Sequence, residues 1–493
     1  MSQPDSDQQA LSPDATTAEA SDYGVGEFGV REPGLRERGV YIKTFGCQMN
    51  EYDTEKMFHL LSAEYDPVSE PEKASVIILN TCSVREKAEH KLFSLLGEMR
   101  ELKKERADLI IGVSGCVAQQ EGSKILSRVE AVDFVVGTHN LSLIPSLVAR
   151  AKAGERSAAI DYREEWEELP SEFDSLPRMR EDGDIQKLRG YLTPVRALVA
   201  IQRGCNKRCS FCVVPTTRGK EVSRDPQEIL REIRLKARAG AREVMLLGQT
   251  VNSYGRDLSP RFGFHTLVRQ IAEIEGITRI RFTSPHPVEV RPEFIELYGD
   301  VPQLMPHIHL PLQSGNDRVL REMNRNYKVR RYLDIVDAVR TRLPSVAITT
   351  DIIVGFPTES AAEFEDTLRL VEQVRYHAAY YFKYSRRPNT VAVNEYPKDA
   401  DIAASEVSER FQRLDALQTQ ISSEINSSLT GEIVEVLIEG ANLGQLSSKK
   451  GRIPQNTLVE LSCPDDLVGE TVHAKVVHTS PRGVRAELLS TDG

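Results

Sequence analysis

The sequence predicts an α/β protein of three parts: an N-terminal doubly wound parallel α/β domain, a partial (β/α)6 barrel and a small C-terminal antiparallel β-barrel. Three observations predict this fold class. In the first part, short apolar segments alternate with amphipathic helical patterns. Six further strand–helix pairs follow over about 230 residues, which is typical of a barrel-like α/β domain. The last segment instead alternates apolar and polar side chains, with glycines and prolines between the runs.

The N-terminal domain is expected over residues 38–155. Helical patterns at 53–65 and 86–106 separate segments that carry an apolar run or end in cysteine. Buried strands of a parallel sheet have such runs, because helices cover both faces of the sheet. The expected strands and strand-like segments are KTFGC (43–47), VIILNTC (76–82), LIIGVSGC (109–116) and VDFVVGT (132–138).

Two polar segments flank this domain. Residues 1–37 are expected to be a disordered acidic tail, because eight acids stand against three Lys/Arg up to Arg38. The tail has neither the basic start nor the apolar stretch of a signal peptide, and no apolar run approaches the roughly 18 residues of a membrane span. We therefore expect a cytoplasmic protein without a membrane partner. Residues 156–190 are expected to be a linker that Trp166 anchors to a domain.

The barrel-like core is expected over residues 191–423, closed by a long amphipathic helix at 404–429. His307 and His309 fall on one face of its fourth strand, where we expect structural burial rather than metal binding. The expected strands are 197–204, 243–251, 278–284, 307–313, 346–356 and 378–385.

The C-terminal β-barrel is expected over residues 426–490. This segment has six Lys/Arg against eight Asp/Glu, and the whole chain has a net charge of −10. Neither value shows the excess of positive charge that is typical of a nucleic-acid-binding protein, although a local basic surface is compatible with both.

The chain has seven cysteines, an odd number spread over 493 residues. Without a secretion signal, this pattern argues against a disulfide framework and favours metal binding or catalysis. Cys463 stands alone in the expected C-terminal barrel, and we expect it to be structural. The other six form two groups of three.

Cys205, Cys209 and Cys212, here called the core trio, have the spacing C-x3-C-x2-C after the first strand of the core. Barrel folds place active sites at such strand ends. A cuboidal 4Fe–4S cluster on three thiolates leaves one iron with an open position. S-adenosylmethionine can chelate that iron and, on receiving an electron, yield a 5′-deoxyadenosyl radical. The alternatives are a zinc site completed from elsewhere and unligated core cysteines.

Cys47, Cys82 and Cys116, here called the N-terminal trio, each end a strand or strand-like segment, 35 and 34 residues apart. Each interval is one β/α unit, so a parallel sheet would bring the three side chains to one carboxyl-terminal edge. That edge is the usual binding crevice of open α/β sheets. We expect a second cluster here, with buried core thiols as the alternative.

The motifs of the chain are long and specific: TFGCQMNEYDTEKM, ILNTCSVREKAEHKLFSLLG, GVSGCVAQQEG, RGCNKRCSFCVVPTTRGKEVSR, LLGQTVNSYG, RFTSPHP, HLPLQSGNDRVLREMNR and DIIVGFPTES. They resemble the radical S-adenosylmethionine methylthiotransferases and, among these, the tRNA-2-methylthio-N(6)-dimethylallyladenosine synthase branch. The resemblance covers residues 38–490. The chain departs from the family pattern at Thr216, where an aromatic residue is usual, and at Asn389, where a glycine is usual.

The resemblance implies a radical 4Fe–4S cluster on the core trio, an auxiliary 4Fe–4S cluster on the N-terminal trio and a C-terminal TRAM domain. The implied substrate is a tRNA whose adenosine 37 already carries an isopentenyl group. One S-adenosylmethionine would methylate a sulfur at the auxiliary cluster, and a second would give the radical that removes hydrogen from carbon 2 of the adenine. Both sites should then face one cavity that an extruded base can enter.

Further candidates are polar residues near strand ends and basic residues around the cysteine loop. Gln249 and Asn252 follow the second strand, where radical cores hold the methionine end of the cofactor. Ser284, Gln313 and Asp351 are candidates for binding ribose or substrate, with buried structural roles as the alternative. The candidates for RNA phosphate contact, as against a solvated basic loop, are Arg203, Lys207, Arg208, Arg218 and Lys220.

The sequence therefore predicts a radical enzyme that methylthiolates a tRNA adenosine. We expect a monomer that receives electrons from a reduced flavodoxin- or ferredoxin-like donor, while the sulfur donor is left open. Alternatives within the superfamily are methylthiolation of threonylcarbamoyl-adenosine in tRNA or of an aspartate of a ribosomal protein. The alternative of another class is a non-enzymatic iron–sulfur protein that binds RNA or senses redox state.

Overall fold

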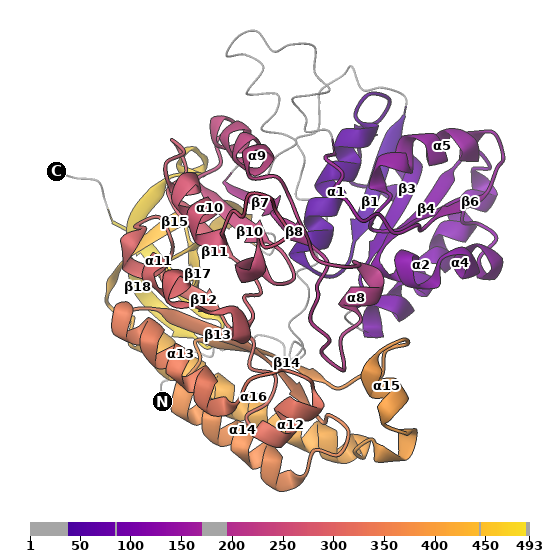
Figure 1. Cartoon of the computed structure of the whole chain (residues 1–493). Coiled ribbons are helices and arrows are strands. Elements are labelled where there is room, and N and C mark those ends of the chain that lie inside the picture. Colours follow the sequence, from indigo (N-terminus) through magenta and orange to yellow (C-terminus); the bar gives the residue numbers. More distant parts are fainter. Residues whose placement is uncertain (1–37, 84–85, 170–194, 443–444, 490–493) are drawn as a thin grey trace, which may run out of the picture.

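The computed structural model describes residues 38–83, 86–169, 195–442 and 445–489. The expected tail, most of the expected linker and residue 490 of the expected barrel lie outside the described residues. Figure 1 shows, in chain order, an α/β sheet, a larger α/β core and a small barrel. Within the described ranges, no helix is long and apolar enough to cross a membrane.

The N-terminal sheet has six strands in the order β2-β1-β3-β4-β5-β6, and every neighbouring pair is parallel. The segment expected at 43–47 is wrong in position, because β1 begins at Gly39 and pairs the apolar run VYI with β3. The sequence did not predict β2, nor β6, which falls in the expected linker. The strands are β1 (Gly39–Thr44), β2 (Asp66–Pro67), β3 (Ala74–Thr81), β4 (Ile110–Gly115), β5 (Phe134–Val136) and β6 (Ser157–Ala159).

Helices cover both faces of this sheet, which confirms the doubly wound arrangement. On one face, α1 (Gln48–Leu61) and α5 (Ile144–Lys152) bury side chains such as Met57 and Leu147. On the other, α2 (Glu86–Glu105) buries Leu92 and Leu96. The short helices α3 (Cys116–Glu121) and α4 (Ser123–Arg128) lie on that second face.

The core is a partial barrel of six parallel strands. The sheets β7-β10-β11 and β12-β13-β14 are joined by a parallel bridge between Ile280 and Leu304. All six strands lie where the sequence predicted them. They are β7 (Arg196–Ala200), β10 (Glu243–Leu247), β11 (Arg279–Phe282), β12 (His307–His309), β13 (Ala347–Val354) and β14 (Ala378–Lys383).

One layer of helices buries the outer side of these strands in a single apolar cluster. The first helix begins at Pro226, where the Asp225 side chain caps the amides of Gln227 and Glu228. The main helices are α9 (Pro226–Arg238), α10 (Phe264–Ala272), α11 (Pro292–Asp300), α13 (Val329–Arg342), α14 (Ala361–Val374) and α16 (Ala404–Ser427). Shorter elements are β8 (Gln202–Arg203), α8 (Val214–Thr217), β9 (Val222–Ser223), α12 (Asp317–Glu322) and α15 (Val391–Glu395).

Helix α1 of the N-terminal sheet packs against the core. Met49 and Tyr52 of α1 form an apolar cluster with Met245 and Leu247 of β10, on the face of that strand opposite to α9 and α10. Trp166 packs on the same cluster, as predicted for an anchor of the segment that connects the two parts. The residues that follow Cys47 therefore lie beside the core.

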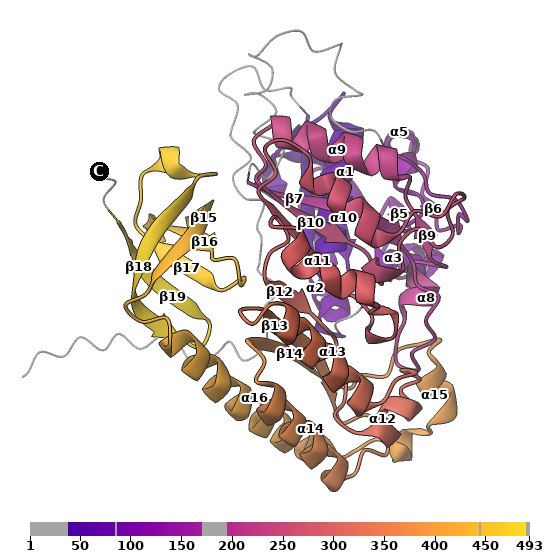
Figure 2. The same cartoon turned by 60° about the vertical axis from the view of Figure 1, so that its left-hand side comes forward.

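The C-terminal barrel is closed, with the strand order β15-β16-β17-β19-β18. It is not wholly antiparallel as predicted, because β17 and β19 pair in parallel. Arg279, at the amino end of β11, donates to the carbonyl of Arg452 at 2.7 Å and pairs with Glu435 at 2.8 Å. The barrel therefore docks at the amino-terminal ends of the core strands (Figure 2). Its strands are β15 (Ile433–Asn442), β16 (Gln445–Arg452), β17 (Leu458–Leu461), β18 (Thr471–Ser480) and β19 (Gly483–Leu488).

A buried ion cluster joins α1 to α9. The Glu232 carboxylate lies 3.2 Å from both Lys56 and Lys236 and pairs with Arg224. Tyr52 donates a hydrogen bond to it at 3.3 Å. Burial opposes ionisation, but attraction by these three cations holds the pKa of Glu232 well below its usual value. The carboxylate is thus the common counter-ion of cations from both parts of the molecule.

We expect Glu232→Gln to lower the free energy of unfolding by about 3–5 kcal/mol, because three buried cations lose their shared anion. Urea unfolding of the full chain measures the change. Glu228→Gln on the same helix is the control, since its half-exposed pair with Arg231 should change stability by about 1 kcal/mol or less. Equal effects of the two substitutions would contradict the assigned role.

Three histidines of the core, His307, His309 and His377, are partly buried. Both rings of β12 contact the Thr349 hydroxyl, His307 at 3.1 Å and His309 at 3.0 Å, which agrees with the predicted structural role. Burial and then Arg281 lower the pKa of His307 well below its usual value. Burial and then Arg340 lower the pKa of His377 to about 4, and its Nδ1 accepts a hydrogen bond from the Ile348 amide at 3.3 Å.

We expect stability to fall as the pH drops from about 6.5 towards 4, because unfolded histidine has a pKa of about 6.5 and binds protons that folded His377 does not. The contribution is fully present above that window. His377→Asn keeps an acceptor for Ile348 but does not titrate, so its loss of stability between pH 7.5 and 5 should be smaller by on the order of 1 kcal/mol. Urea unfolding at the two pH values measures this difference, and identical pH slopes for the two proteins would refute it.

Candidate active site

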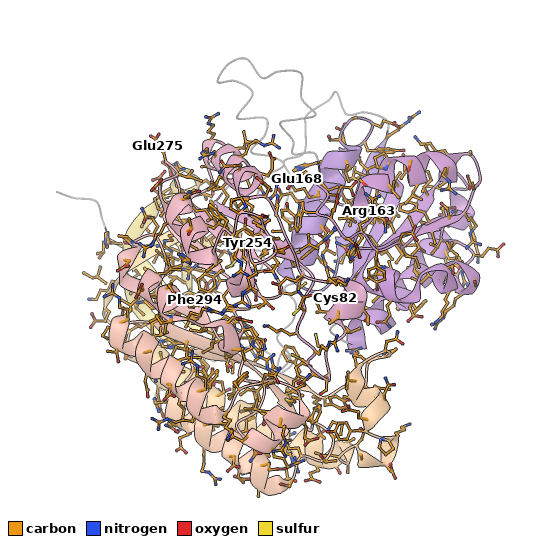
Figure 3. The ribbon with its side chains drawn as sticks, in the orientation of Figure 1. Cys82, Arg163, Glu168, Tyr254, Glu275 and Phe294 are labelled. Carbon is orange, nitrogen blue, oxygen red and sulfur yellow. The ribbon has the colours of Figure 1, made fainter. Side chains whose placement is uncertain are left out.

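The three cysteines of the N-terminal trio meet at the carboxyl-terminal edge of the N-terminal sheet. Cys47 is the N-cap of α1, Cys82 follows β3 directly, and Cys116 begins α3 directly after β4. Because β1, β3 and β4 are neighbours, the three turns lie side by side. The Cys82 thiol hydrogen-bonds to both Cys47 and Cys116. Figure 3 shows Cys82 at the boundary between this sheet and the core.

Glycines allow this close approach. Gly46 has a φ of +119°, and a Cβ there would overlap the side chain of Cys82. Gly115 has a φ of +90°, and a Cβ there would overlap the Thr81 carbonyl. Both positions require the left-handed region, which glycine adopts without strain. The sequences FGC and SGC are therefore needed to bring Cys47 and Cys116 to Cys82.

The surroundings of this trio favour the thiolate form of Cys116 and Cys47. Hydrogen bonding with Cys82, opposed by burial and aided by Arg218, lowers the pKa of Cys116 to about 6. Hydrogen bonding with Cys82 likewise lowers the pKa of Cys47. The pKa of Cys82 is raised by its hydrogen bonds to Cys116 and Cys47, because it is the shared donor.

Arg218 is a buried cation beside this trio, although it belongs to the core. Its side chain is 5% exposed. The guanidinium forms an ion pair with Asp53 Oδ2 at 2.7 Å and donates a hydrogen bond to Asn50 Oδ1 at 2.7 Å. Its positive charge also helps to lower the pKa of Cys116. Asn50 and Asp53 are one helical turn apart on α1 and hold the guanidinium in place.

The core trio lies in the loop after β8. Gly204 opens this loop with a φ of +73°, and a Cβ there would collide with the backbone of Lys220. Two of the sulfurs have backbone or hydroxyl neighbours: the Lys207 amide lies 3.4 Å from Cys205 Sγ, the Thr250 hydroxyl 3.3 Å from Cys205 Sγ, and the Val214 amide 3.5 Å from Cys212 Sγ. Burial raises the pKa of Cys212 to about 12.

Arg325 is the buried cation at the core trio. Its Nη1 donates to Cys209 Sγ at 3.3 Å, and its Nη2 donates to the Pro311 carbonyl at 3.3 Å. Phe211 packs beside this loop in an apolar cluster that includes Ile353 and Phe356. One side of the core trio is therefore apolar, and the cation lies at Cys209.

A single loop connects the two trios. After Cys212, residues 213–220 run along the edge of the N-terminal sheet. The Thr138 hydroxyl donates to the Thr217 carbonyl at 2.7 Å, and the Tyr162 hydroxyl donates to the Thr216 carbonyl. Arg218 then reaches Cys116. At Thr216, where the family usually has an aromatic residue, the contact with Tyr162 is made by the backbone carbonyl. Asn389, where the family usually has a glycine, has a φ of 63°, a conformation that asparagine shares with glycine.

The donor sets fit iron–sulfur clusters. All ligand candidates are thiols, and N–H groups point at the sulfurs of the core trio, as is usual around such clusters. In the part of the chain that the structure describes, no three His, Cys, Asp or Glu are arranged to hold a single metal ion. Because all six ligand candidates are thiols, this donor set suits two iron–sulfur clusters, one on each trio.

The predicted polar residues lie at the carboxyl ends of the core strands or near them. Gln249 has a buried Oε1 without a hydrogen-bond partner among the described residues. The Asn252 side chain forms two hydrogen bonds with the backbone of His286: it accepts from the amide at 2.9 Å and donates to the carbonyl at 3.0 Å. Ser284 and Gln313 have φ values of 54° and 72°. Asp351 lies 3.3 Å from His309.

The basic residues predicted to contact RNA include both exposed and buried side chains. Arg208 and Lys220 are exposed, and Lys207 is paired with Glu289. Arg203 is buried, donates to backbone carbonyls of the connecting segment and lies over Trp166. For Arg203 and Arg218, the prediction of RNA contact does not fit, because neither guanidinium is at the surface.

Sequence analysis missed several residues of this site. They are Asn50 and Asp53 at Arg218, Thr250 at Cys205, Arg325 at Cys209, and Gln202, which is fully buried and has no described partner for either amide atom. The spacing of Asn50 and Asp53 on one helix face after Cys47 was a usable signal. Arg325 is distant in sequence from Cys209 and gave none.

Two family models match the chain. The model described as the radical SAM superfamily matches residues 199–371, which contain the core trio. The model described as the uncharacterized protein family UPF0004 matches residues 39–137, which contain the N-terminal trio.

The chain is similar to curated proteins over most of its length. It is 42% identical over 467 residues to the tRNA-2-methylthio-N(6)-dimethylallyladenosine synthase of Syntrophobacter fumaroxidans, covering 92% of this chain and 96% of that protein. It is 42% identical over 450 residues to the synthase of the same name of Geobacter metallireducens, covering 91% and 98%.

Among solved structures, the radical S-adenosylmethionine methyltransferase TsrM of Kitasatospora setae matches with a TM-score of 0.51. The match covers 72% of this chain and 74% of that protein at 13% identity, so it shows the fold alone. Together with the relatives above, the two matched models show that this chain belongs to the tRNA-2-methylthio-N(6)-dimethylallyladenosine synthase family of the radical SAM superfamily.

Proposed function

We propose that this protein methylthiolates carbon 2 of N(6)-isopentenyladenosine at position 37 of tRNA. The observation that carries the proposal is the loop 213–220, which leaves the core trio at Cys212 and contacts the N-terminal trio through Arg218. Two thiol sites joined in this way suit one reaction that needs both. Membership of a family whose members are named for this product supports the same function.

The residues of the two trios would hold the cofactors. Cys205, Cys209 and Cys212 would bind a 4Fe–4S cluster together with S-adenosylmethionine, and Cys47, Cys82 and Cys116 would bind the second 4Fe–4S cluster. When bound, these groups supply the electron, the 5′-deoxyadenosyl radical, the methyl group and a site for sulfur.

The chain itself orients and shields these groups. The amides of Lys207 and Val214 would fix the thiolates of Cys205 and Cys212. The apolar cluster around Phe211 keeps water from one side of the core trio. Exclusion of water matters because a reactive radical attacks whatever lies beside it.

Unpartnered polar groups in the core would bind cofactor and substrate. Gln249 is proposed for this role because its buried Oε1 is without a described partner, and Gln202 because the same is true of both its amide atoms. Ser284, Gln313 and Asp351 are proposed to contact ribose or base. Tyr380, opposite Asp351 in the strand pairing and 42% exposed, offers an aromatic surface on which a base could stack.

Arg208 and Lys220 are proposed as phosphate contacts beside the cysteine loop, since both are exposed. Lys207 is proposed to join them if its pair with Glu289 opens. We propose that the protein acts as a monomer in the cytoplasm. A flavodoxin- or ferredoxin-like protein would deliver the electrons to it.

The function is tested by nucleoside mass spectrometry of tRNA from cells that lack the gene and are complemented with variants of the full chain. We expect the natural chain to restore 2-methylthio-N(6)-isopentenyladenosine. Cys82→Ala and Cys212→Ala should each leave N(6)-isopentenyladenosine without the methylthio group, because either loses a cluster ligand. Cys463→Ala is the control and should restore the product, since Cys463 packs in the C-terminal barrel.

The result that would overturn the proposal is an unchanged level of 2-methylthio-N(6)-isopentenyladenosine in cells with and without the gene. A methylthio mark that appears instead on threonylcarbamoyl-adenosine would point to a different tRNA substrate.

The RNA contact is tested by measuring tRNA affinity against salt concentration. We expect Lys220→Gln to weaken binding and to reduce the slope of log K against log salt by about 1, because one phosphate contact is lost. Lys73→Gln should leave both unchanged, because Lys73 precedes β3 at the opposite edge of the N-terminal sheet from the cysteines. Equal slopes for the natural chain and Lys220→Gln would remove Lys220 from the contact surface.

A further inference from the structure

Each cysteine trio has one buried arginine that reaches it from another part of the chain. Arg218 comes from the core loop and contacts Cys116 of the N-terminal sheet. Arg325 follows α12 and contacts Cys209. Both side chains are nearly inaccessible to solvent. Their charge therefore acts on the sulfurs and not on the surface of the molecule.

The position of Arg218 is fixed by two groups on α1. Asn50 accepts a hydrogen bond from its guanidinium at 2.7 Å, and the Asp53 carboxylate forms an ion pair with it at 2.7 Å. Helix α8, directly before Arg218, packs against α3, which begins at Cys116. Cys47 lies close enough to feel its charge. A guanidinium stays protonated in proteins, so this is a constant positive charge beside two of the three sulfurs.

A constant charge at this place has an electrical consequence. The reduction potential of an iron–sulfur cluster depends on its net charge, on hydrogen bonds to its sulfurs and on its exposure to solvent. Reduction adds negative charge, and a buried cation stabilises that charge more strongly than the same cation would in water. Asp53 opposes the effect, because its carboxylate offsets part of the arginine's charge.

We propose that Arg218 is a positioning residue of the core that raises the reduction potential of the cluster on the N-terminal trio, and that Asp53 limits this increase. Asn50 and Asp53 hold the Arg218 guanidinium at the N-terminal trio, beside Cys116. The inference rests on the proposed cluster at Cys47, Cys82 and Cys116. It adds to that proposal a residue from the other half of the molecule that sets the properties of this cluster.

The test uses the full chain with Cys205→Ala, Cys209→Ala and Cys212→Ala, which leaves only the N-terminal trio to hold a cluster. In this parent we would compare Arg218→Met, Arg218→Lys and Asp53→Asn after anaerobic reconstitution with iron and sulfide. Iron and sulfide contents report cluster binding, and a redox titration followed by electron paramagnetic resonance gives the midpoint potential. Thermal unfolding checks that each variant is folded.

We expect Arg218→Met to shift the midpoint potential to more negative values and Asp53→Asn to shift it to more positive values. Arg218→Lys keeps the charge and should lie closer to the parent than Arg218→Met does. Arg325→Met is the matched control, because it removes a buried arginine whose cysteine partner is absent from this parent, so the potential should not change. If Arg218→Met fails to hold iron, the other two variants decide the matter: the proposal requires a more positive midpoint potential for Asp53→Asn and a potential close to that of the parent for Arg218→Lys.

Two failures are distinguishable. A parent protein that binds no iron and sulfide would overturn the proposed cluster on the N-terminal trio. A parent that binds the cluster but has the same midpoint potential as its Arg218→Met and Asp53→Asn variants would overturn the role of Arg218 and leave the cluster assignment standing.

Discussion

Only five residues lie between Cys212 and Arg218, and this short connection is the constraint on which the arrangement of the site depends. An extended chain spans at most about 3.5 Å per residue, so the two α-carbons can be no more than about 20 Å apart. Part of the segment is the helix α8, which shortens the span further. Because Arg218 is held by Asp53 and Asn50, the core trio cannot move away from the N-terminal sheet without breaking a buried ion pair.

A second set of contacts prevents the two parts from rotating about that connection. Helix α1 begins at the N-terminal trio, packs its Met49 and Tyr52 on β10, and places Lys56 against Glu232 of α9. One helix therefore takes part in the cysteine site at its first turn and in the buried ion cluster further along. Taken alone, a buried ion pair is a weak source of stability, but its geometry is demanding. Here the ions fix an orientation between two α/β units.

The fold was largely predictable from the sequence, because the strands of both α/β parts carry apolar runs whose period and spacing are characteristic. The errors have physical reasons. β1 was placed late because the prediction tied the strand to Cys47, whereas the apolar run VYI that pairs with β3 lies at 40–42. β6 was missed because SAA at 157–159 has small side chains. The parallel pair β17–β19 depends on how the barrel closes, which alternation of side chains does not report.

The cysteines of the candidate site were predictable, because their spacing along the chain indicates them. The residues that reach the cysteines through packing were less predictable. The two trios could be grouped because their spacings match a loop and two β/α units. The surroundings of Arg203 and Arg218 could not be read in the same way, since both lie in a basic segment that resembles a solvated loop. Only the folded chain shows that Arg218 enters the N-terminal sheet and that Arg325 reaches Cys209.

The C-terminal barrel docks at the amino-terminal ends of the core strands, so its attachment is separated in space from the two thiol sites. The barrel is held by Arg279 and Arg281 of β11, whose guanidinium groups donate to the carbonyls of Arg452, Ile453 and Pro454. The two thiol sites instead follow the carboxyl ends of strands, with Cys82 after β3 and the core trio after β8. A change of charge on the barrel, where acids exceed basic residues, should therefore leave the construction of the two thiol sites unchanged.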